Sequence, residues 1–182
     1  FAHALEHAQM LVAGVPERPV FQCLFAIVSR QAGDYEGALA AFDKVLEKLP
    51  EDPATLTSRG HALKTYGRSE QAIEAYQAAI RAAPQNGDAW YALANLKTYR
   101  FTDSELAELE DIQASPDLSF MSRVHIAFAL GKAFEDRGAH PEAFANYQRG
   151  NDLKRKQTRY TTDQMQAEFA AQKLYCTADM IA

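Results

Sequence analysis

The chain has 182 residues, of which 47% are apolar and 24% charged, with a formal net charge of −5. This composition is ordinary for a globular protein with a continuous hydrophobic core. The acidic balance argues against a nucleic-acid partner, because no basic face large enough to neutralise a phosphate backbone is evident. The most apolar run, residues 20–28, is too short to span a bilayer, so we expect no membrane partner.

The cysteines and the start of the chain bear on the cellular location of the protein. Cys23 and Cys176 are isolated and define neither a disulfide framework nor a zinc-binding spacing. Because no secretory signal peptide is present either, we expect a cytoplasmic protein. The chain lacks an initiating Met and opens inside a helical pattern, so we expect it to be a fragment of a longer protein.

A helix–turn–helix unit over residues 53–86 sets the pattern for the whole chain. Small residues stand where two helices must approach closely, and bulky residues fill the space beside them. The turn glycine is Gly67 and the residue that ends the second helix is Pro84. The small residues are Gly60, Ala72 and Ala79, and the bulky ones are Leu63 and Tyr76.

The same spacing recurs along the chain. Moving back 34 residues from Gly67 and Pro84 reaches Gly33 and Pro50. A later copy carries its turn glycine at Gly138, 71 residues after Gly67, so about three residues are inserted in the third unit. One such unit cannot bury its apolar face alone, whereas a fixed period over four units predicts an all-α helical solenoid of antiparallel helix pairs.

The pattern predicts one solenoid domain over residues 1–182. In chain order, its parts are a partial helix of a truncated repeat (1–18), a first repeat (19–52) with helices near 20–31 and 35–48, a second repeat (53–86), an irregular third repeat (87–119), a fourth repeat (120–157) with helices near 120–137 and 141–156, and a terminal helix (158–182) that covers the last apolar face.

The third repeat departs from the glycine turn. Asp88 is expected to cap a helix that runs to about Tyr99, and Thr102 or Asp103 is expected to cap a second helix through about Gln113. The last helix of the chain is expected to be capped by Thr161 or Thr162.

No catalytic constellation or cofactor site is evident. Gly131-Lys132 is the nearest approach to a phosphate-binding loop, but the preceding glycine of that motif is missing. His3 and His7 share a helix face without a third metal ligand nearby, which favours surface histidines over a metal site. We therefore predict that this segment is not an enzyme and holds no cofactor or metal.

The repeat spacing resembles the tetratricopeptide repeat family over nearly the whole chain. The resemblance implies a right-handed superhelix whose first helices line a concave groove for peptides or partner domains. Some members clamp a C-terminal carboxylate with Lys and Asn residues, but only Asn95 matches that set here, so this clamp is not expected. The groove-facing candidates are Thr57, His61, Lys64, Asp88, Tyr91, Asn95, Thr98, His125, Phe128, Lys132 and Glu135.

A narrower resemblance covers about residues 85–175. The segments 89–101, 129–136 and 143–151 are similar to bacterial proteins that join tetratricopeptide repeats to a C-terminal sulfotransferase domain. The resemblance implies that such a domain follows this segment, although no donor-binding or catalytic residue can be placed on the present chain.

Three functional hypotheses stay open. The repeats position a polypeptide substrate or partner for an attached sulfotransferase-like enzyme, form a free-standing adaptor, or assemble with a second copy of themselves. The basic run Lys154-Arg155-Lys156, with Arg159, is interpreted as a solvated helix end that complements the helix dipole. An electropositive patch that faces a following domain is the alternative.

Overall fold

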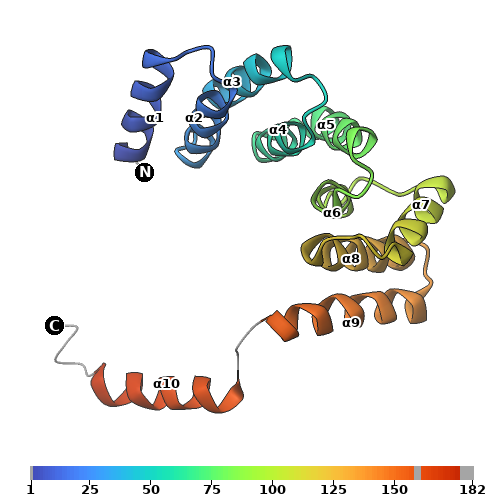
Figure 1. Cartoon of the computed structure of the whole chain (residues 1–182). Helices are drawn as coiled ribbons and strands as arrows, with labels where there is room; N and C mark the ends of the chain where they lie inside the picture. Colours follow the sequence, from blue (N-terminus) through green and yellow to red (C-terminus); the bar gives the residue numbers. More distant parts are fainter. Residues whose placement is uncertain (1, 158–160, 177–182) are drawn as a thin grey trace.

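A computed structural model describes residues 2–157 and 161–176, which form ten α helices arranged in an arc (Figure 1). No strand occurs in these two ranges, which confirms the predicted all-α fold. The helices are α1 (Ala2–Gly14), α2 (Pro19–Gln31), α3 (Tyr35–Lys48), α4 (Pro53–Thr65), α5 (Ser69–Ala82), α6 (Gly87–Ala94), α7 (Asp103–Ala114), α8 (Phe120–Asp136), α9 (His140–Gln157) and α10 (Thr162–Tyr175).

Side-chain caps determine where several helices begin. The Asp34 carboxylate accepts a hydrogen bond from the backbone N–H of Gly37 at 2.9 Å, and α3 starts directly after it. Thr102 caps α7 in a complete capping box, in which the Glu105 carboxylate accepts in return from the Thr102 backbone N–H at 2.8 Å. Each cap satisfies amide donors that have no partner within the helix.

Glycine turns join the helices of the regular pairs. Gly33, Gly67 and Gly138 lie between α2 and α3, α4 and α5, and α8 and α9, with φ of +88°, +87° and +72°. These left-handed conformations are costly for residues with a Cβ. The period in the sequence had marked the same three glycines as turns, so the repeat spacing has a direct structural cause.

Two of these pairs, α4–α5 and α8–α9, close by packing a glycine of one helix against a tyrosine ring of the next. A Cβ on Gly60 would lie 2.4 Å from the Tyr76 ring, and a Cβ on Gly131 would lie 2.5 Å from the Tyr147 ring. Around these contacts a single hydrophobic cluster extends from Ala26 to Ala133, and its largest fully buried side chain is Trp90.

Helix α6 is shorter than the sequence predicts and starts with a different cap. Asn86, not Asp88, accepts from the first turn, and α6 ends at Ala94 instead of continuing to Tyr99. The chain turns here because Leu96 is drawn into the core, where it is 5% exposed. The Asp88 side chain is consequently available for contacts outside its own helix.

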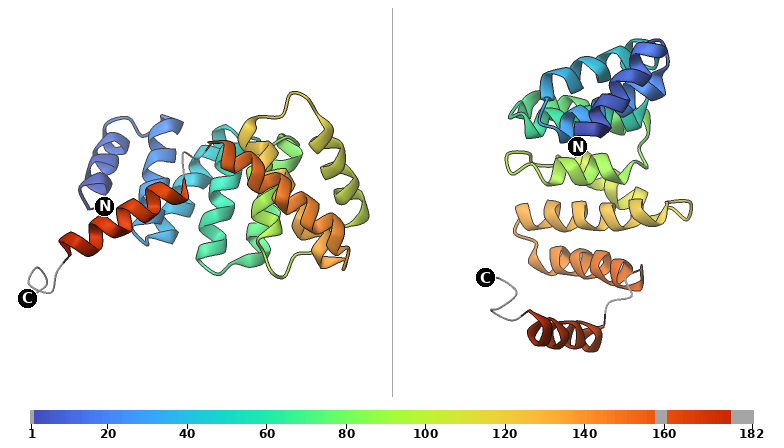
Figure 2. Two further views of the ribbon diagram at one scale, coloured as in Figure 1. Left: turned by 90° about the horizontal axis from the view of Figure 1, so that it is seen from below. Right: turned by 90° about the vertical axis from the view of Figure 1, so that its left-hand side faces the viewer.

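The third repeat does not close as a helix pair. Helix α6 packs directly against α8, whereas α7 contacts α8 and, within the described chain, not α6. Figures 1 and 2 show α7 on the outer side of the arc. The close approach of α6 to α8 occurs at Gly87, where a Cβ would lie 2.7 Å from the Ser122 Cα atom. The buried side chains of Leu109 and Ile112 hold α7 in its displaced position.

Helix α10 does not cover the end of the solenoid as predicted. It is capped by Thr161, but in the described ranges it contacts no other helix and buries none of its residues (Figure 2). The outer surface of α9 gives a reason, because its exposed residues are mostly polar, with Phe144 as an apolar exception. The prediction that residues 158–182 cap the last apolar face is therefore wrong for the described part of that segment.

The substitution Gly87→Ala should destabilise the fold through the α6–α8 contact. The added methyl group meets the Ser122 backbone, which cannot swing aside as a side chain could. We expect a loss of about 1–3 kcal/mol in the free energy of unfolding, measured by urea denaturation. Gly14→Ala is the control, since nothing lies within 4 Å of its Cβ position. Equal stability of the two variants would contradict the close approach.

Candidate functional site

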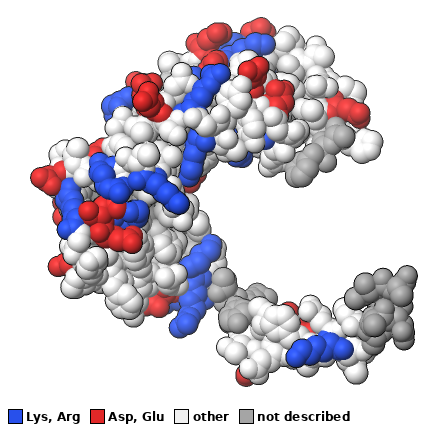
Figure 3. Space-filling model, turned by 180° about the vertical axis from the view of Figure 1, so that it is seen from behind, with Lys and Arg blue, Asp and Glu red and all other residues white. Residues whose placement is uncertain are grey.

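The inner side of the arc is formed mainly by α4, α6 and α8, with α2 and α9 towards its two ends (Figure 1). Figure 3 shows the resulting hollow from behind. Most of the groove residues predicted from the sequence lie on these three helices, so the question is which of them the fold brings into contact.

Aromatic rings from three helices meet on α8. The Tyr91 ring of α6 stacks on the His125 imidazole with centroids 5.2 Å apart and planes 7° apart. Phe128 lies beside them, 5.9 Å from Tyr91, and the Tyr147 ring of α9 lies 6.2 Å from Phe128. All four side chains are half-buried. We call these four residues the ring cluster; it offers a continuous surface for apolar or planar groups.

An acidic residue lies between two histidines beside the ring cluster. The Asp88 carboxylate is 3.5 Å from His61 Nε2, and His61 Nδ1 shares a hydrogen bond of 2.9 Å with the Tyr76 hydroxyl. The hydrogen bond with His61 is the main cause that lowers the pKa of Asp88, and the charges of His61 and His125 act in the same direction. Asp88 is therefore ionised at neutral pH.

The groups around His125 shift its pKa in opposite directions. Burial is the main cause that lowers its pKa below the ordinary value of 6.5, and the Lys154 ammonium group of α9 adds to this effect. The Asp88 carboxylate opposes both. His125 is accordingly neutral at pH 7 in the unliganded protein, and its protonation state is sensitive to any charge that enters the hollow.

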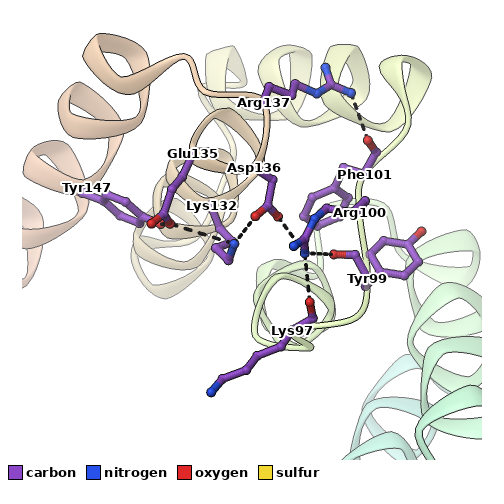
Figure 4. Close-up of polar contacts among 9 residues, drawn as sticks. All are labelled: Lys97, Tyr99, Arg100, Phe101, Lys132, Glu135, Asp136, Arg137 and Tyr147. Atoms are coloured by element: carbon purple, nitrogen blue, oxygen red, sulfur yellow. Dashed lines mark hydrogen bonds and ion pairs between the residues drawn. The ribbon is translucent and has the colours of Figure 1, made fainter.

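A second polar network joins the irregular segment after α6 to the end of α8 (Figure 4). The Asp136 side chain, 11% exposed, pairs with Lys132 on its own helix and with Arg100 at 3.3 Å. Arg100 also donates to the backbone carbonyls of Lys97 and Tyr99 at 2.9 and 3.0 Å. The network fixes the segment that replaces the missing glycine turn.

Two predicted groove residues take part in contacts on α8. Lys132 is held by Asp136 and lies 4.0 Å from Glu135, and the Tyr147 hydroxyl donates to the Glu135 carboxylate at 2.7 Å (Figure 4). Burial raises the pKa of Tyr147, and the hydrogen bond to Glu135 raises it further. These side chains border the ring cluster and orient Tyr147 within it.

The remaining predicted residues do not gather into one site. Thr57 is buried, 4% exposed, where its hydroxyl donates to the Pro53 carbonyl and accepts from the Asn86 side chain. It joins α4 to the start of α6 and is not open to a ligand. Lys64, Asn95 and Thr98 are exposed at or beyond the C-terminal ends of α4 and α6.

The sequence predictions missed three residues that lie near the site. Tyr147 matches Tyr76 in the period and had been assigned to the packing of the helix pair. Arg30 stands 34 residues before Lys64, so the period could have placed it in the same groove position. Lys154 was interpreted as part of a solvated helix end, or of a patch that faces a following domain, because its distance from α8 depends on how α8 and α9 pack.

The contacts of the site, among the residues that the structure describes, are packing contacts and hydrogen bonds. None of the His, Cys, Asp and Glu residues that the structure describes form a group of three able to hold a metal ion. The histidines contact rings, a carboxylate and a phenol, and neither contacts an activated nucleophile. In the described ranges, no helix combines the length and apolar character needed to cross a membrane.

The charges around His125 can be tested by titration. Asp88→Asn should lower the pKa of His125 further, because the carboxylate favours the imidazolium form. Lys154→Gln should raise this pKa towards 6.5, since it removes a like charge. The measurement is the pH dependence of the His125 Hε1 resonance, with Lys44→Gln on α3 as the control. Identical curves for all three variants would contradict the arrangement.

Comparisons with known proteins agree with the geometry. Residues 29–96 match the family model of the tetratricopeptide repeat. A stretch of 69 residues is 36% identical to a TPR repeat-containing thioredoxin, TTL4, of Arabidopsis thaliana; the match covers 38% of this chain and 10% of that protein. The chain spans a tenth or less of the length of the curated relatives it matches.

Solved structures share the fold over most of the chain. A crystal structure of MamA superposes with a TM-score of 0.62 at 16% identity, covering 86% of this chain and 90% of that one. MamA from Desulfovibrio magneticus RS-1 superposes with a TM-score of 0.60 at 20% identity, covering 86% of both chains. Residues 29–96 therefore match the tetratricopeptide repeat, and the chain shares the helical-repeat fold of these solved structures.

Proposed function

We propose that this chain is a protein-interaction module that binds a polypeptide segment along the inner side of its arc. The observation that carries the proposal is the ring cluster, in which Tyr91, His125, Phe128 and Tyr147 form one half-buried surface across three helices. Aromatic residues held in place by their neighbours bind partners at low cost in conformational entropy. Concave solenoid surfaces are long enough to contact several side chains of one peptide.

The rigidity of the site supports binding over catalysis. Tyr91 is fixed by stacking, Asp88 by His61, and Tyr147 by Glu135. A preorganised surface of this kind needs no cofactor, and we propose that none is used. The half-buried Cys23 lies 3.4 Å from the Thr55 hydroxyl, in a packing contact. An unpaired packed cysteine suits the reducing bacterial cytoplasm in which we place the module.

The module is further proposed to serve an attached sulfotransferase-like enzyme by positioning its polypeptide substrate. The support is the resemblance of residues 85–175 to bacterial fusion proteins, which includes the irregular third repeat. A free-standing adaptor is the second candidate, and assembly with a second copy is a third. The adaptor is favoured by the coverage of the MamA chains, since similar helical arcs make up 86–90% of those chains.

The parent gene distinguishes the attached enzyme from the adaptor. If the module serves a sulfotransferase-like enzyme, the hundred codons after residue 182 should encode a phosphate-binding loop for the sulfonate donor, with the spacing that such loops require. A stop codon in this interval would overturn the attached-enzyme proposal and leave the adaptor.

Peptide selection tests the binding function itself. The folded protein is used to select from a displayed library of random dodecapeptides, and Tyr91→Ala should weaken the enriched peptides roughly tenfold or more by removing the central ring. Tyr66→Ala is the matched control: the Tyr66 ring also stacks on a neighbour, Tyr35, at 5.6 Å, but outside the ring cluster. Circular dichroism checks that both variants fold.

Two outcomes would contradict the proposal. Either no peptide is enriched over an unrelated helical protein, or the enriched peptides bind Tyr91→Ala as tightly as the unchanged chain. Equal losses in Tyr91→Ala and Tyr66→Ala would also oppose it, because they would indicate a general loss of structure.

A further inference from the structure

Cationic side chains lie at the two ends of the inner side of the arc, although the chain as a whole is acidic. The chain has a formal net charge of −5. Across the inner helices, however, the ionisable groups near the ring cluster run from Arg30 on α2 through His61 and His125 to Lys154 on α9. The acidic residues beside the cluster already have partners: Asp88 is paired with His61, and Glu135 accepts from the Tyr147 hydroxyl and lies 4.0 Å from Lys132.

Arg30 supplies the cationic group at the α2 end. Its side chain is half-buried, and its Nε atom is buried without a hydrogen-bond partner among the described residues. Its positive charge acts on Tyr76, where it opposes the burial that raises the pKa of that hydroxyl. Arg30 therefore lies close to the hydrogen-bonded pair of Tyr76 and His61. The part of the guanidinium group that stays accessible favours a ligand with acceptor oxygens, such as a carboxylate.

Lys154 supplies the cationic group at the α9 end. Its ammonium nitrogen lies 3.8 Å from the sulfur of Met121, at the start of α8. Met121, His125 and Phe128 follow one another at four and three residues, so they lie on one face of α8. The ammonium group is thus beside the ring cluster, and its charge lowers the pKa of His125.

The end of α9 borders the hollow of the arc. Figure 3 shows Lys and Arg side chains gathered on this border, and the last turn of α9 supplies Lys154, Arg155 and Lys156. Arg159, which the sequence grouped with them, lies outside the described residues. The interpretation of the basic run as a solvated helix end is therefore incomplete, because Lys154 faces α8 and its histidine.

We propose that the polypeptide bound in this groove is an acidic segment, with carboxylate side chains at Arg30 and at Lys154 and an apolar or aromatic side chain on the ring cluster. The inference rests on the proposed function and specifies its partner class. A basic segment would bring like charges against both ends of the groove, whereas an acidic one can pair with the cation at each end.

The distance between the two cations distinguishes binding of side-chain carboxylates from binding of a C-terminal carboxylate. Arg30 and Lys154 belong to helices towards opposite ends of the arc (Figure 1). A single terminal carboxylate cannot reach both, so the carboxylates must come from side chains along the segment. A peptide with blocked termini should consequently bind as well as one with free termini.

Binding should also be coupled to protonation of His125. The charged groups that face His125 are Lys154 from α9 and Asp88 from α6, and His61 of α4 pairs with Asp88. A ligand carboxylate beside Lys154 would offset the ammonium charge and raise the pKa of His125. Affinity should therefore increase as the pH falls from about 7.5 to 5.5, while Asp and Glu side chains of the ligand remain ionised.

The experiment compares selections from the same dodecapeptide library on three proteins. Peptides enriched by the unchanged chain should contain an excess of Asp and Glu over the unselected library. The double variant Arg30→Gln/Lys154→Gln should lose this excess and bind the acidic peptides at least tenfold more weakly. Lys44→Gln/Arg81→Gln changes the net charge equally on the outer helices α3 and α5 and should bind them unchanged.

The outcomes separate this inference from the binding function. If peptides are enriched and depend on Tyr91 but show no acidic excess, the acidic partner is overturned and the binding function stands. If both double variants weaken binding equally, net charge and not the groove is responsible, which also overturns the inference. If nothing is enriched, the proposed function itself fails.

A synthetic copy of one enriched peptide, acetylated and amidated, completes the test by fluorescence anisotropy. Its dissociation constant should fall several-fold between pH 7.5 and 5.5, and His125→Gln should remove most of this change. Binding that requires a free C-terminal carboxylate would overturn the placement of carboxylates along the segment. A dissociation constant that is unchanged by pH would overturn the role given to His125.

Discussion

The contact between a glycine and a tyrosine ring determines both the packing and the inner surface of this arc. At Gly60 and Gly131 the absence of a Cβ lets the rings of Tyr76 and Tyr147 cross the partner helix at van der Waals distance. Each ring is long enough to carry its hydroxyl to the far side, where it meets His61 in one pair and Glu135 in the other. The same contact therefore closes a helix pair and positions polar groups of the groove.

The irregular repeat brings the two halves of the groove together. Because the glycine turn is missing, α7 does not pack against α6 as it would in a regular pair, and α6 packs against α8 instead. This rearrangement places Tyr91 on His125 and Asp88 within reach of both histidines. The burial of Leu96 and Leu109 offsets the lost pairing of α6 with α7. The departure from the repeat thus adds Tyr91 to the rings that α8 and α9 already bring together.

The repeat period predicts the features that depend on residues near one another in the sequence. It fails for features that are determined by contacts between distant residues. The turns at Gly33, Gly67 and Gly138 and the cap at Thr102 were predictable, because each is a local demand of the backbone. The length of α6, the detachment of α10 and the position of Lys154 depend on packing between repeats. The position within the repeat was enough to predict the groove candidates on α6 and α8, but which of them contact one another could be seen only in the structure.

The separation of charge constrains how an acidic partner could approach. At distances beyond a Debye length of about 8–10 Å, the net charge of −5 repels an acidic segment, and salt weakens that repulsion. Once the segment is inside the hollow, the half-buried Arg30 is screened less than exposed charges are, and the exposed Lys154 ammonium group acts at contact distance. Selectivity then comes from the short-range fit of carboxylates and rings, because long-range attraction is absent. A non-specific polyanion gains little binding free energy from the surface as a whole. A segment whose carboxylates are spaced to reach both Arg30 on α2 and Lys154 on α9 gains binding free energy at both ends.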